Sequence, residues 1–545
     1  MRELRYHRYP WETLLRNPGD CDPNGRTWSS GDVLRLPPGA QVSFALGRGR
    51  LHRIAMTDSL VAMPERREPV RMRVVDAFSD LDRTIELEAP ASLAEVSPRR
   101  TFRDLPLYET VLAWSSFFDE CLVDERGGEL AEPLSWEAVA ERLETLLANP
   151  DEPQMSLIVR IADALTTTLE AFERGIRRVL TRDRRMMPAD KAEEFDAASV
   201  DWYVRQPGRT AAEKAAFNQQ RLKAVARREF VDTLENRVLK DFLKRSAAEA
   251  RRWCGALATP GQLASARALR VRRFERLCMR LLALPAFEEI LPVTGVVQPN
   301  YVLQGDARYR KIWRFYQLLL RRQRAADTLW AWQSRLWSDV AQAAVNVVLA
   351  RMAEKSRRGD SPWRIEPLAD SAPSISFEQS DGRRLEGETS SGPFIIRRRG
   401  AGMADGCVLE LVESERLPEC LSASPDWRED RLGDVCGAVA ALLTPLSAGA
   451  RMRRTAILFW PLHSLADGIL DQPSVLRTME AALDGLEGSG FDVRGVALSS
   501  DLLGMPAVSL ERSVVLQLGA RPADWAKTFP VLEEQINAML GAIFR

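Results

Sequence analysis

The sequence predicts a multidomain α+β protein with a β-rich N-terminal domain, a helical middle domain and a C-terminal α/β domain. Three observations predict this class. Turn signals separate short apolar runs over residues 1–130, apolar residues recur at helical spacing over 131–358, and strand-like and helix-like runs alternate over 375–545. Residues 359–374 read as a linker. A chain of 545 residues is long enough for roughly three to four domains.

Composition excludes several classes of protein. The chain is 45% hydrophobic and 28% charged, with 76 basic and 76 acidic residues. Zero net charge disfavours a protein that coats nucleic acid indiscriminately, although it allows a local basic groove. The N-terminal MRELRYHRYPW lacks the apolar core of a secretory signal, and no segment approaches the roughly 20 apolar residues of a membrane span. We therefore expect no membrane association.

Cysteine and histidine usage restricts the compartment and the metal chemistry. The seven cysteines are scattered without a C-x-x-C pair, which is typical of reduced thiols in a cytoplasmic protein. The three histidines, His7, His52 and His463, are far apart, so a Cys/His zinc site is not expected. Any metal would have to be held by carboxylates.

The N-terminal and middle domains differ in their hydrophobic period. VLRL, VSFAL, RMRVVDAF and TIELEA are short strand candidates between turn signals such as NPGDCDPNG and LPPGA. Helical spacing follows in SLIVRIADALTTTLEAFERGIRRVL, TAAEKAAFNQQRLKAVARREF, LASARALRVRRFERLCMRLLAL and the run from KIWRFYQ to ARMAEK. We expect all four of these middle segments to be helices.

The C-terminal domain reads as strands followed by alternating helices and strands. SISFEQ, RRLEGET, FIIRRR and CVLELVE are strand candidates, RLGDVCGAVAALLTPL is a predicted helix ended by proline, and TAILFWPL is a buried strand. A helix in PSVLRTMEAALDGLEGSG, strands in VRGVALSS and SVVLQLG, and a helix in VLEEQINAMLGAIF complete the order. This succession predicts an α/β domain with a mixed sheet.

One carboxylate breaks the pattern of the helix predicted in VDTLENRVLKDFLKR. Glu235 falls near the middle of the apolar face of this helix. Three interpretations are open. Glu235 bonds back to the helix start in a capping box with Asp232 or Thr233. Alternatively, Glu235, Asn236 and Arg237 form a buried polar knot, which requires a partner for the carboxylate, most simply an arginine. The third interpretation is a direct catalytic role.

Three segments carry a resemblance to a known family. They are VDWYVRQPG (200–208), DTLENRVLKDFL (232–243) and YVLQGDARYRKIWRFYQLL (301–319). In this order and spacing they resemble the helical domain of McrC-type proteins, the partner subunits of McrBC modification-dependent restriction systems. The motif residues are Glu235, Asn236, Arg237 and Lys240 in the second segment, and Tyr309 and Arg310 in the third. The resemblance implies an AAA+ NTPase or helicase partner, DNA as a further partner, and a following nuclease domain of the PD-(D/E)XK type.

In an active nuclease of this type, an aspartate on one strand and a Glu-x-Lys on the next hold Mg²⁺ and orient the attacking water. The matching positions are Asp405, before CVLELVE, and Glu413 or Glu415 after it, with Asp434 on the predicted following helix. No lysine occurs between Lys355 and Lys527, and the guanidinium of Arg416 is not equivalent to an ammonium group. The sequence therefore predicts a degenerate, inactive nuclease domain without a cofactor. Mg²⁺ is expected only if activity survives.

DNA contact is predicted at RRRGAG, where Arg397, Arg398 and Arg399 could meet a phosphate backbone. The alternative is a solvated edge hairpin. For the whole protein, two other functions stay open beside the accessory subunit. One is a metal-dependent DNA endonuclease with a rearranged site around Asp405, Glu413 and Glu415. The other is a structural scaffold that does not contact nucleic acid.

Overall fold

A computed structural model of the chain contains two compact units, one made of Met1–Ser156 and Arg321–Arg545, the other of Leu157–Leu320. The first is called unit 1 and the second unit 2. The chain is thus a mixed α/β protein with more than one compact part, as predicted. The structure describes residues 5–7, 9–15, 33–35, 40–46, 50–53, 60–62, 70–76, 81–87, 110, 113–114, 116–118, 121, 136–149, 151–153, 155–217, 221–257, 259–328, 333–367, 391–402, 405–422, 432, 435–447, 453–462, 472–486, 490–499, 507–519 and 521–544.

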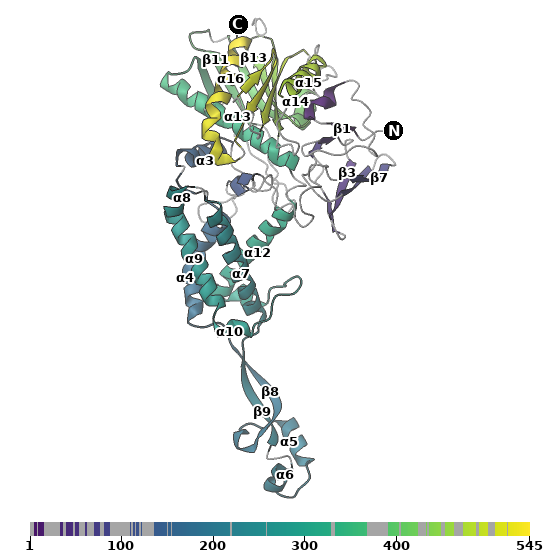
Figure 1. The fold of residues 1–545 in the computed structure, drawn as a ribbon, viewed down its shortest axis with the longest axis vertical. Helices are drawn as coiled ribbons and strands as arrows, with labels where there is room; N and C mark the ends of the chain where they lie inside the picture. The colour runs from purple at the N-terminus through teal and green to yellow at the C-terminus, as the bar shows by residue number, and fades with distance from the viewer. Residues whose placement is uncertain are drawn as a thin grey trace. The chain divides into compact units, whose positions relative to one another are not determined.

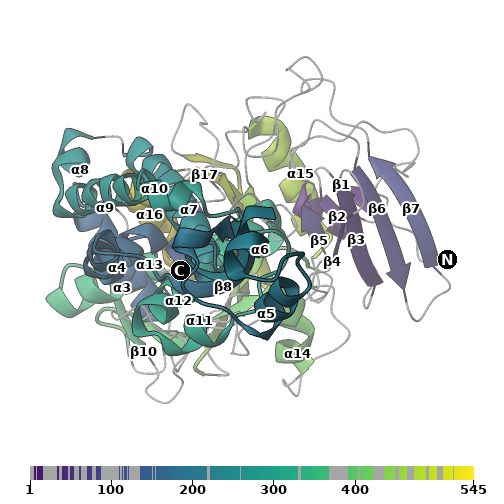
Figure 2. The same cartoon turned by 90° about the horizontal axis from the view of Figure 1, so that it is seen from below.

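The N-terminal part of unit 1 contains the strands that the sequence predicted. A three-stranded antiparallel sheet has the order β1-β2-β5, with β1 (Arg5–His7), β2 (Val33–Arg35) and β5 (Leu60–Ala62). A four-stranded sheet has the order β4-β3-β6-β7, with β3 (Ala40–Leu46), β4 (Arg50–Arg53), β6 (Val70–Asp76) and β7 (Leu81–Leu87). Strands β3, β6 and β7 lie side by side in Figure 2.

The centre of unit 1 is an eight-stranded mixed sheet with the order β10-β11-β12-β13-β14-β15-β17-β16. Strands β10 to β14 form an antiparallel meander, whereas β15 joins β14 and β17 in parallel. The strands are β10 (Trp363–Pro367), β11 (Ser391–Arg398), β12 (Gly406–Glu413), β13 (Val439–Pro445), β14 (Thr455–Leu462), β15 (Asp492–Ser499), β16 (Ala507–Ser509) and β17 (Ser513–Gln517).

Two sequence predictions are wrong in this region. The helix expected in RLGDVCGAVAALLTPL is strand β13, which pairs with β12 on one side and β14 on the other. Its central residues are buried on both faces of the sheet, so their apolar run is continuous and carries no strand-like alternation. The linker expected at 359–374 contains the edge strand β10. The predicted strands SISFEQ and RRLEGET lie outside the described residues.

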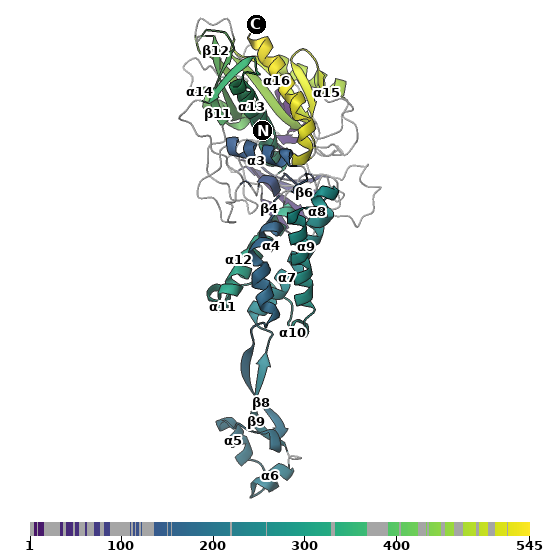
Figure 3. The same cartoon turned by 90° about the vertical axis from the view of Figure 1, so that its left-hand side faces the viewer.

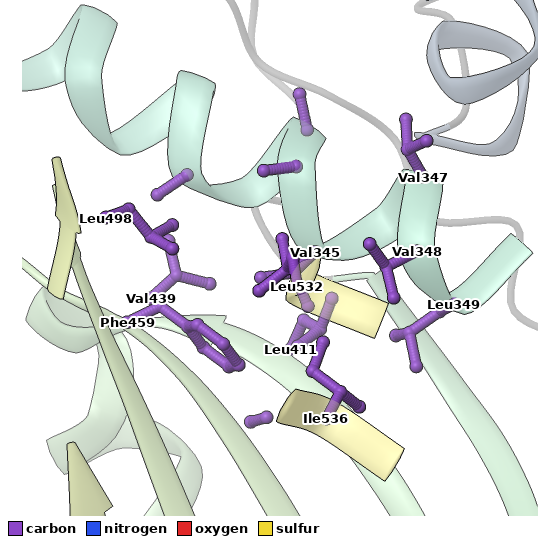
Figure 4. Close-up of a cluster of buried hydrophobic side chains, with 14 of the residues drawn as sticks. Val345, Val347, Val348, Leu349, Leu411, Val439, Phe459, Leu498, Leu532 and Ile536 are labelled. Atoms are coloured by element: carbon purple, nitrogen blue, oxygen red, sulfur yellow. The ribbon is translucent and has the colours of Figure 1, made fainter. Parts of the chain in front are cut away.

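Helices cover both faces of the eight-stranded sheet (Figure 1). On one face, α13 (Gln333–Arg358), α16 (Phe529–Ile543) and α3 (Trp136–Ala148) bury apolar side chains against the strands. Figure 4 shows part of this core, where Val345 and Leu532 lie close to Leu411 and Phe459. On the other face lie α15 (Gln472–Asp484), α14 (Leu417–Ser422) and the N-terminal 3-10 helix η1 (Pro10–Leu14).

The N-terminal segment completes the second face. Trp11 is fully buried, and its Nε1 donates to Oγ1 of Thr478 on α15 at 3.1 Å. Its ring contacts Trp460 on β14 edge-on, with 5.6 Å between the ring centroids. Residues 9–15 are therefore part of the core that surrounds the C-terminal sheet, rather than of a separate β-rich domain.

Unit 2 consists of a helical bundle and a long two-stranded arm. The helices are α4 (Leu157–Glu173), α5 (Ala197–Val204), α6 (Ala211–Phe217), α7 (Leu234–Gly255), α8 (Pro260–Ala264), α9 (Ala266–Leu282), α10 (Pro285–Glu288), α11 (Tyr301–Gly305) and α12 (Ala307–Thr328), the last of which continues past residue 320. The 3-10 helix η3 (Ala189–Lys191) completes the set. Strands β8 (Val179–Pro188) and β9 (Arg221–Phe230) pair antiparallel over their full length and are called the ribbon. Figures 1 and 3 show the ribbon leaving the helices of this unit and carrying α5 and α6 at its far end.

The ribbon corrects a second set of predictions. Helix α4 ends at Glu173 instead of running on through Leu180, and the helical run expected up to Phe230 becomes β9 after residue 221. RLKAVARREF contains good helix formers, but pairing with β8 outweighs that local preference. Helix α9 is found where it was predicted. No helix among the described residues combines the length and apolarity required to cross a bilayer.

Candidate functional site: a polar network at the root of the ribbon

The carboxylate of Glu235 lies in a buried polar knot. Glu235 is 2% exposed and is not the partner of the helix cap, since Thr233 is the N-cap of α7 without a capping side-chain bond. Its Oε1 accepts from Nη1 of Arg177 at 2.8 Å, and its Oε2 accepts from Nδ2 of Asn300 at 2.9 Å. The buried knot with an arginine partner is therefore confirmed for Glu235 and Asn236, whereas Arg237 pairs with Asp232 instead. The capping box is wrong.

The neighbouring Asn236 fixes the backbone just before the ribbon. Its Nδ2 donates to the backbone oxygen of Arg177 at 2.8 Å, and its Oδ1 accepts from the hydroxyl of Tyr309 at 2.6 Å. The same hydroxyl accepts from the backbone N–H of Arg177 at 3.1 Å. Both backbone polar groups of Arg177 are thus bound by side chains of α7 and α12. We call Arg177, Glu235, Asn236, Asn300 and Tyr309 the root network.

Burial determines the electrostatics of this network. Burial raises the pKa of Tyr309 to about 12, so the hydroxyl stays protonated and can donate to Asn236 at any physiological pH. The charge of Glu235 is balanced by Arg177, which is partly exposed while the carboxylate is not. Every oxygen of Glu235 is already bonded, so this carboxylate is a poor candidate for a general base.

A second set of contacts joins α7 to the segment after α9. Arg237 forms two hydrogen bonds with Asp232, at 2.7 and 2.5 Å, and Oδ1 of Asp232 also accepts from the backbone N–H of Leu291. The Arg237 hydrogen bond holds the pKa of Asp232 below its ordinary value. Nζ of Lys240 donates to the backbone oxygens of Phe287 and Ile290, at 2.6 and 2.5 Å, while burial lowers its pKa. These motif residues hold the loop around α10 in place.

The motif residue Arg310 behaves differently from Tyr309, because its side chain is exposed on α12. Three residues in or beside the root network were not predicted from the sequence, namely Arg177, Asn300 and Arg308. The guanidinium of Arg308 lies 5.1 Å from the ring centroid of Phe172. Arg177 and Asn300 are 58 and 65 residues from Glu235 in sequence, so no local pattern could link them. Asn300 does carry one readable signal, since it caps α11 through Leu303.

Two of the residues predicted for a nuclease site, Asp405 and Glu413, do not come together. Asp405 is exposed in the turn before β12, whereas Glu413 is 2% exposed at the opposite end of the same eight-residue strand. A strand of this length separates its ends by roughly 25 Å, which is too far for two ligands of one metal ion. The side chain of Glu415 and the whole of Asp434 lie outside the described residues. Among the described residues, no group of three or more His, Cys, Asp or Glu side chains is arranged to hold a metal ion.

The three arginines predicted to contact DNA have different environments. Arg399 donates to the backbone oxygens of Gly359 and Ser356, at 2.7 and 2.9 Å, at the C-terminal end of α13. Arg397 is half-buried beside Glu366, with 3.7 Å between its Nη1 and the carboxylate. Arg398 is exposed at the end of β11. The arginines therefore do not form one basic surface.

The fold and the root network define a class of protein. A helical unit that bears a ribbon arm is inserted in the sequence of a second unit, which is built on a mixed sheet. Residues 150–316 match the model of a protein family described as "Domain of unknown function (DUF2357)". The match spans the helical unit almost completely, including the ribbon and the root network. The chain matches no curated protein.

Proposed function

We propose that this chain is an accessory subunit, similar to McrC proteins, of a prokaryotic antiviral defence or restriction system. It acts in the cytoplasm, docks on an AAA+ motor partner and contacts DNA. Its C-terminal sheet is a nuclease-like domain that does not cleave. The proposal rests on the resemblance of three segments in unit 2 and on one structural observation, the arm formed by the ribbon and the residues at its end.

The arm is the observation that carries the proposal. The ribbon is ten residues long, about 33 Å, and the segment at its end, residues 189–217, is called the tip. Val200 and Val204 lie one turn apart on α5 and are 47% and 65% exposed, and Phe195 nearby is 43% exposed. Apolar side chains gathered on a protruding segment favour a protein-binding surface. The root network fixes the backbone at the base of this arm, which supports use of the arm as a rigid docking element for a partner.

The absence of cleavage is supported by the C-terminal sheet. The strands β12 to β14, helix α15 and strand β15 follow one another as strands, helix, strand. The helix expected directly after CVLELVE, however, is the strand β13. Yet β14, the strand beside β13, reads TAILFWPL and carries neither a carboxylate nor a lysine. Asp405 and Glu413 lie at opposite ends of β12, so these two candidates cannot hold one metal ion together.

Copurification tests the docking proposal. The tagged full chain is co-expressed with the products of its neighbouring genes, beside a Val200→Asp/Val204→Asp variant and a Leu269→Asp control. Leu269 is 55% exposed on α9, far along the chain from the tip. We expect an AAA+ NTPase to copurify with the unaltered chain and the control but not with the tip variant. Recovery of no NTPase with any of the three would overturn the docking proposal.

Incubation with DNA separates the other two functions. The purified chain with Mg²⁺ or Mn²⁺ and varied DNA is expected to give no cleavage products. Cleavage would establish the endonuclease instead, and equal cleavage by Asp405→Ala would show that the metal site lies elsewhere. Absence of both nucleic-acid binding and an NTPase partner would leave the structural scaffold as the function.

A further inference from the structure

The ribbon carries a dense positive charge in a chain whose total charge is zero. Its two strands hold seven basic residues and two acidic ones; the basic residues are Arg182, Arg184, Arg185, Arg221, Lys223, Arg227 and Arg228, and the acidic ones are Asp183 and Glu229. Two more arginines, Arg177 and Arg178, precede β8. A structural hairpin has no need of this excess, because like charges on neighbouring strands repel one another.

The pairing register collects most of these cations on one face. Residues directly opposite each other in an antiparallel pair point to the same side. Arg182 pairs with Arg227, Met186 with Lys223, and Pro188 with Arg221. Arg184 shares the side of Arg182 because it lies two residues further along the strand. We call Arg182, Arg184, Arg221, Lys223 and Arg227 the basic face, while Arg185 points to the opposite side.

Only part of this charge is neutralised within the chain. Glu194 in the tip lies between the opposed Arg182 and Arg227, at 3.4 and 2.9 Å, and Asp196 pairs with Arg184. These arginines remain more than half exposed, so the ion pairs are weak and exchangeable. Each guanidinium has five N–H donors and uses only one or two of them here. Within the described part of the chain, Arg221 donates to the backbone oxygen of Met186, at 3.0 Å.

We infer that the basic face of the ribbon binds the phosphate backbone of double-stranded DNA. A two-stranded ribbon has the width that the major groove accepts, and ten residue pairs span about 33 Å, close to one turn of B-DNA. Cations recur from Arg227 to Arg221, over roughly 20 Å of the ribbon, which matches a continuous row of phosphates better than a single acidic peptide site. Glu194 acts as an internal competitor that occupies two of the arginines when DNA is absent.

This inference gives the DNA contact of the proposed function a surface, and it replaces the one predicted at Arg397–Arg399. It does not require the motor partner. The DNA titration below therefore judges the basic face, while the copurification experiment judges the docking proposal, and either can fail alone.

The test measures duplex binding by the purified full chain at several salt concentrations. The variant Arg221→Gln/Lys223→Gln removes two cations of the basic face, and Arg357→Gln/Arg358→Gln removes two exposed cations of α13 as a charge-matched control. Arg185→Gln tests the opposite side of the same ribbon. We expect the basic-face variant to lower the slope of log K against log salt by about 2, since each lost phosphate contact lowers it by about 0.9. The control and Arg185→Gln are expected to stay within about twofold of the unaltered chain.

A variant that strengthens binding completes the test. Glu194→Gln frees Arg182 and Arg227, so duplex affinity and the salt slope are expected to increase, the slope by about 1. Equal binding by the basic-face variant, the control and the unaltered chain would overturn the inference while leaving DNA contact in place elsewhere. Absence of duplex binding by the unaltered chain at low salt, or a clear preference for single strands or RNA, would overturn it as well.

Discussion

The hydroxyl of Tyr309 lies 2.6 Å from Oδ1 of Asn236, although the two residues are 73 positions apart in the sequence. Through this contact α12 and α7 hold the same backbone residue, Arg177, two positions before the ribbon begins. Two of the motif residues, Asn236 and Tyr309, thus contact one another, and both of them and Glu235 bind Arg177 at the base of the arm. Their arrangement can be tested through stability.

Removing the Tyr309 hydroxyl should destabilise unit 2. Tyr309→Phe leaves the buried Oδ1 of Asn236 and the N–H of Arg177 without their partner, at a cost of about 1–3 kcal/mol. Chemical denaturation followed by circular dichroism measures the free energy of unfolding. Tyr301→Phe is the control, because Tyr301 is 86% exposed. Equal stability of both variants would show that the hydroxyl contributes nothing.

A double-mutant cycle measures the ion pair of Glu235 with Arg177. We expect Arg177→Met and Glu235→Gln each to destabilise the fold, and the pair to be coupled by about 1–2 kcal/mol, since the carboxylate is buried and Arg177 is partly exposed. Arg178→Met provides a comparison, because its pair with Glu229 is exposed on both sides. Coupling no larger than that of the exposed pair would contradict a role for Glu235 as a buried anchor.

Acidification should loosen the tip from the ribbon. Hydrogen bonds from Ser199 and Arg184 lower the pKa of Asp196 from 3.8 to about 2. Because the folded-state pKa is the lower one, the stabilisation is complete above pH 3.8 and is lost as the pH falls towards 2. The protection factor of the Ser199 amide, which donates to Asp196, should therefore fall over that range in hydrogen exchange. In Asp196→Asn this pH-dependent fall should be absent.

Substitutions of the neighbouring residues Arg399 and Arg398 should differ in their effect on the stability of unit 1. Gly359 follows α13 with a φ of +94°, and Arg399 donates to its backbone oxygen and to that of Ser356. Arg399→Ala should therefore destabilise unit 1 by about 1 kcal/mol, through loss of a cation at a helix C-terminus. Arg398→Ala should change the melting temperature little, because that side chain is exposed. Identical melting curves would mean that Arg399 does not stabilise the helix end.

The N-terminal segment should be required for the C-terminal sheet. Trp11→Ala empties a fully buried site between Trp460 and α15, and cavity formation of this size costs about 3–5 kcal/mol. Thermal unfolding followed by tryptophan fluorescence measures the loss. Glu12→Ala, one position along the same 3-10 helix, provides a milder comparison. Unchanged stability in Trp11→Ala would indicate that this segment does not complete the core.

Local patterns predicted elements whose hydrophobic period is regular along the sequence. The strands VSFAL and CVLELVE and the helix of α9 follow directly from their periods. Strand β13 did not, because both of its faces are buried, and β9 did not, because its residues favour a helix until β8 pairs with them. The pattern within one segment does not indicate which strand pairs with that segment or which helices cover it.

The sequence revealed the candidate site only through one carboxylate on an otherwise apolar helix face. Glu235 on an apolar face signalled a buried partner, and the sequence indicated an arginine without indicating which one. Arg177 contacts Glu235 from the segment that follows α4, so only the tertiary fold brings the two residues together. Two of the nuclease candidates show the reverse case. Asp405 and Glu413 are close in sequence, but an extended strand keeps residues eight apart distant.

Unit 2 interrupts unit 1, and this order has a practical consequence. Helix α3 precedes the interruption, while α13, α16 and the sheet follow it, yet all of them share one core. A protease that cuts the exposed ribbon would therefore produce two fragments that stay associated without a covalent link. Native size-exclusion chromatography would then give one peak where denaturing electrophoresis gives two bands, and a shortened gene that begins or stops inside unit 2 would encode half of a core.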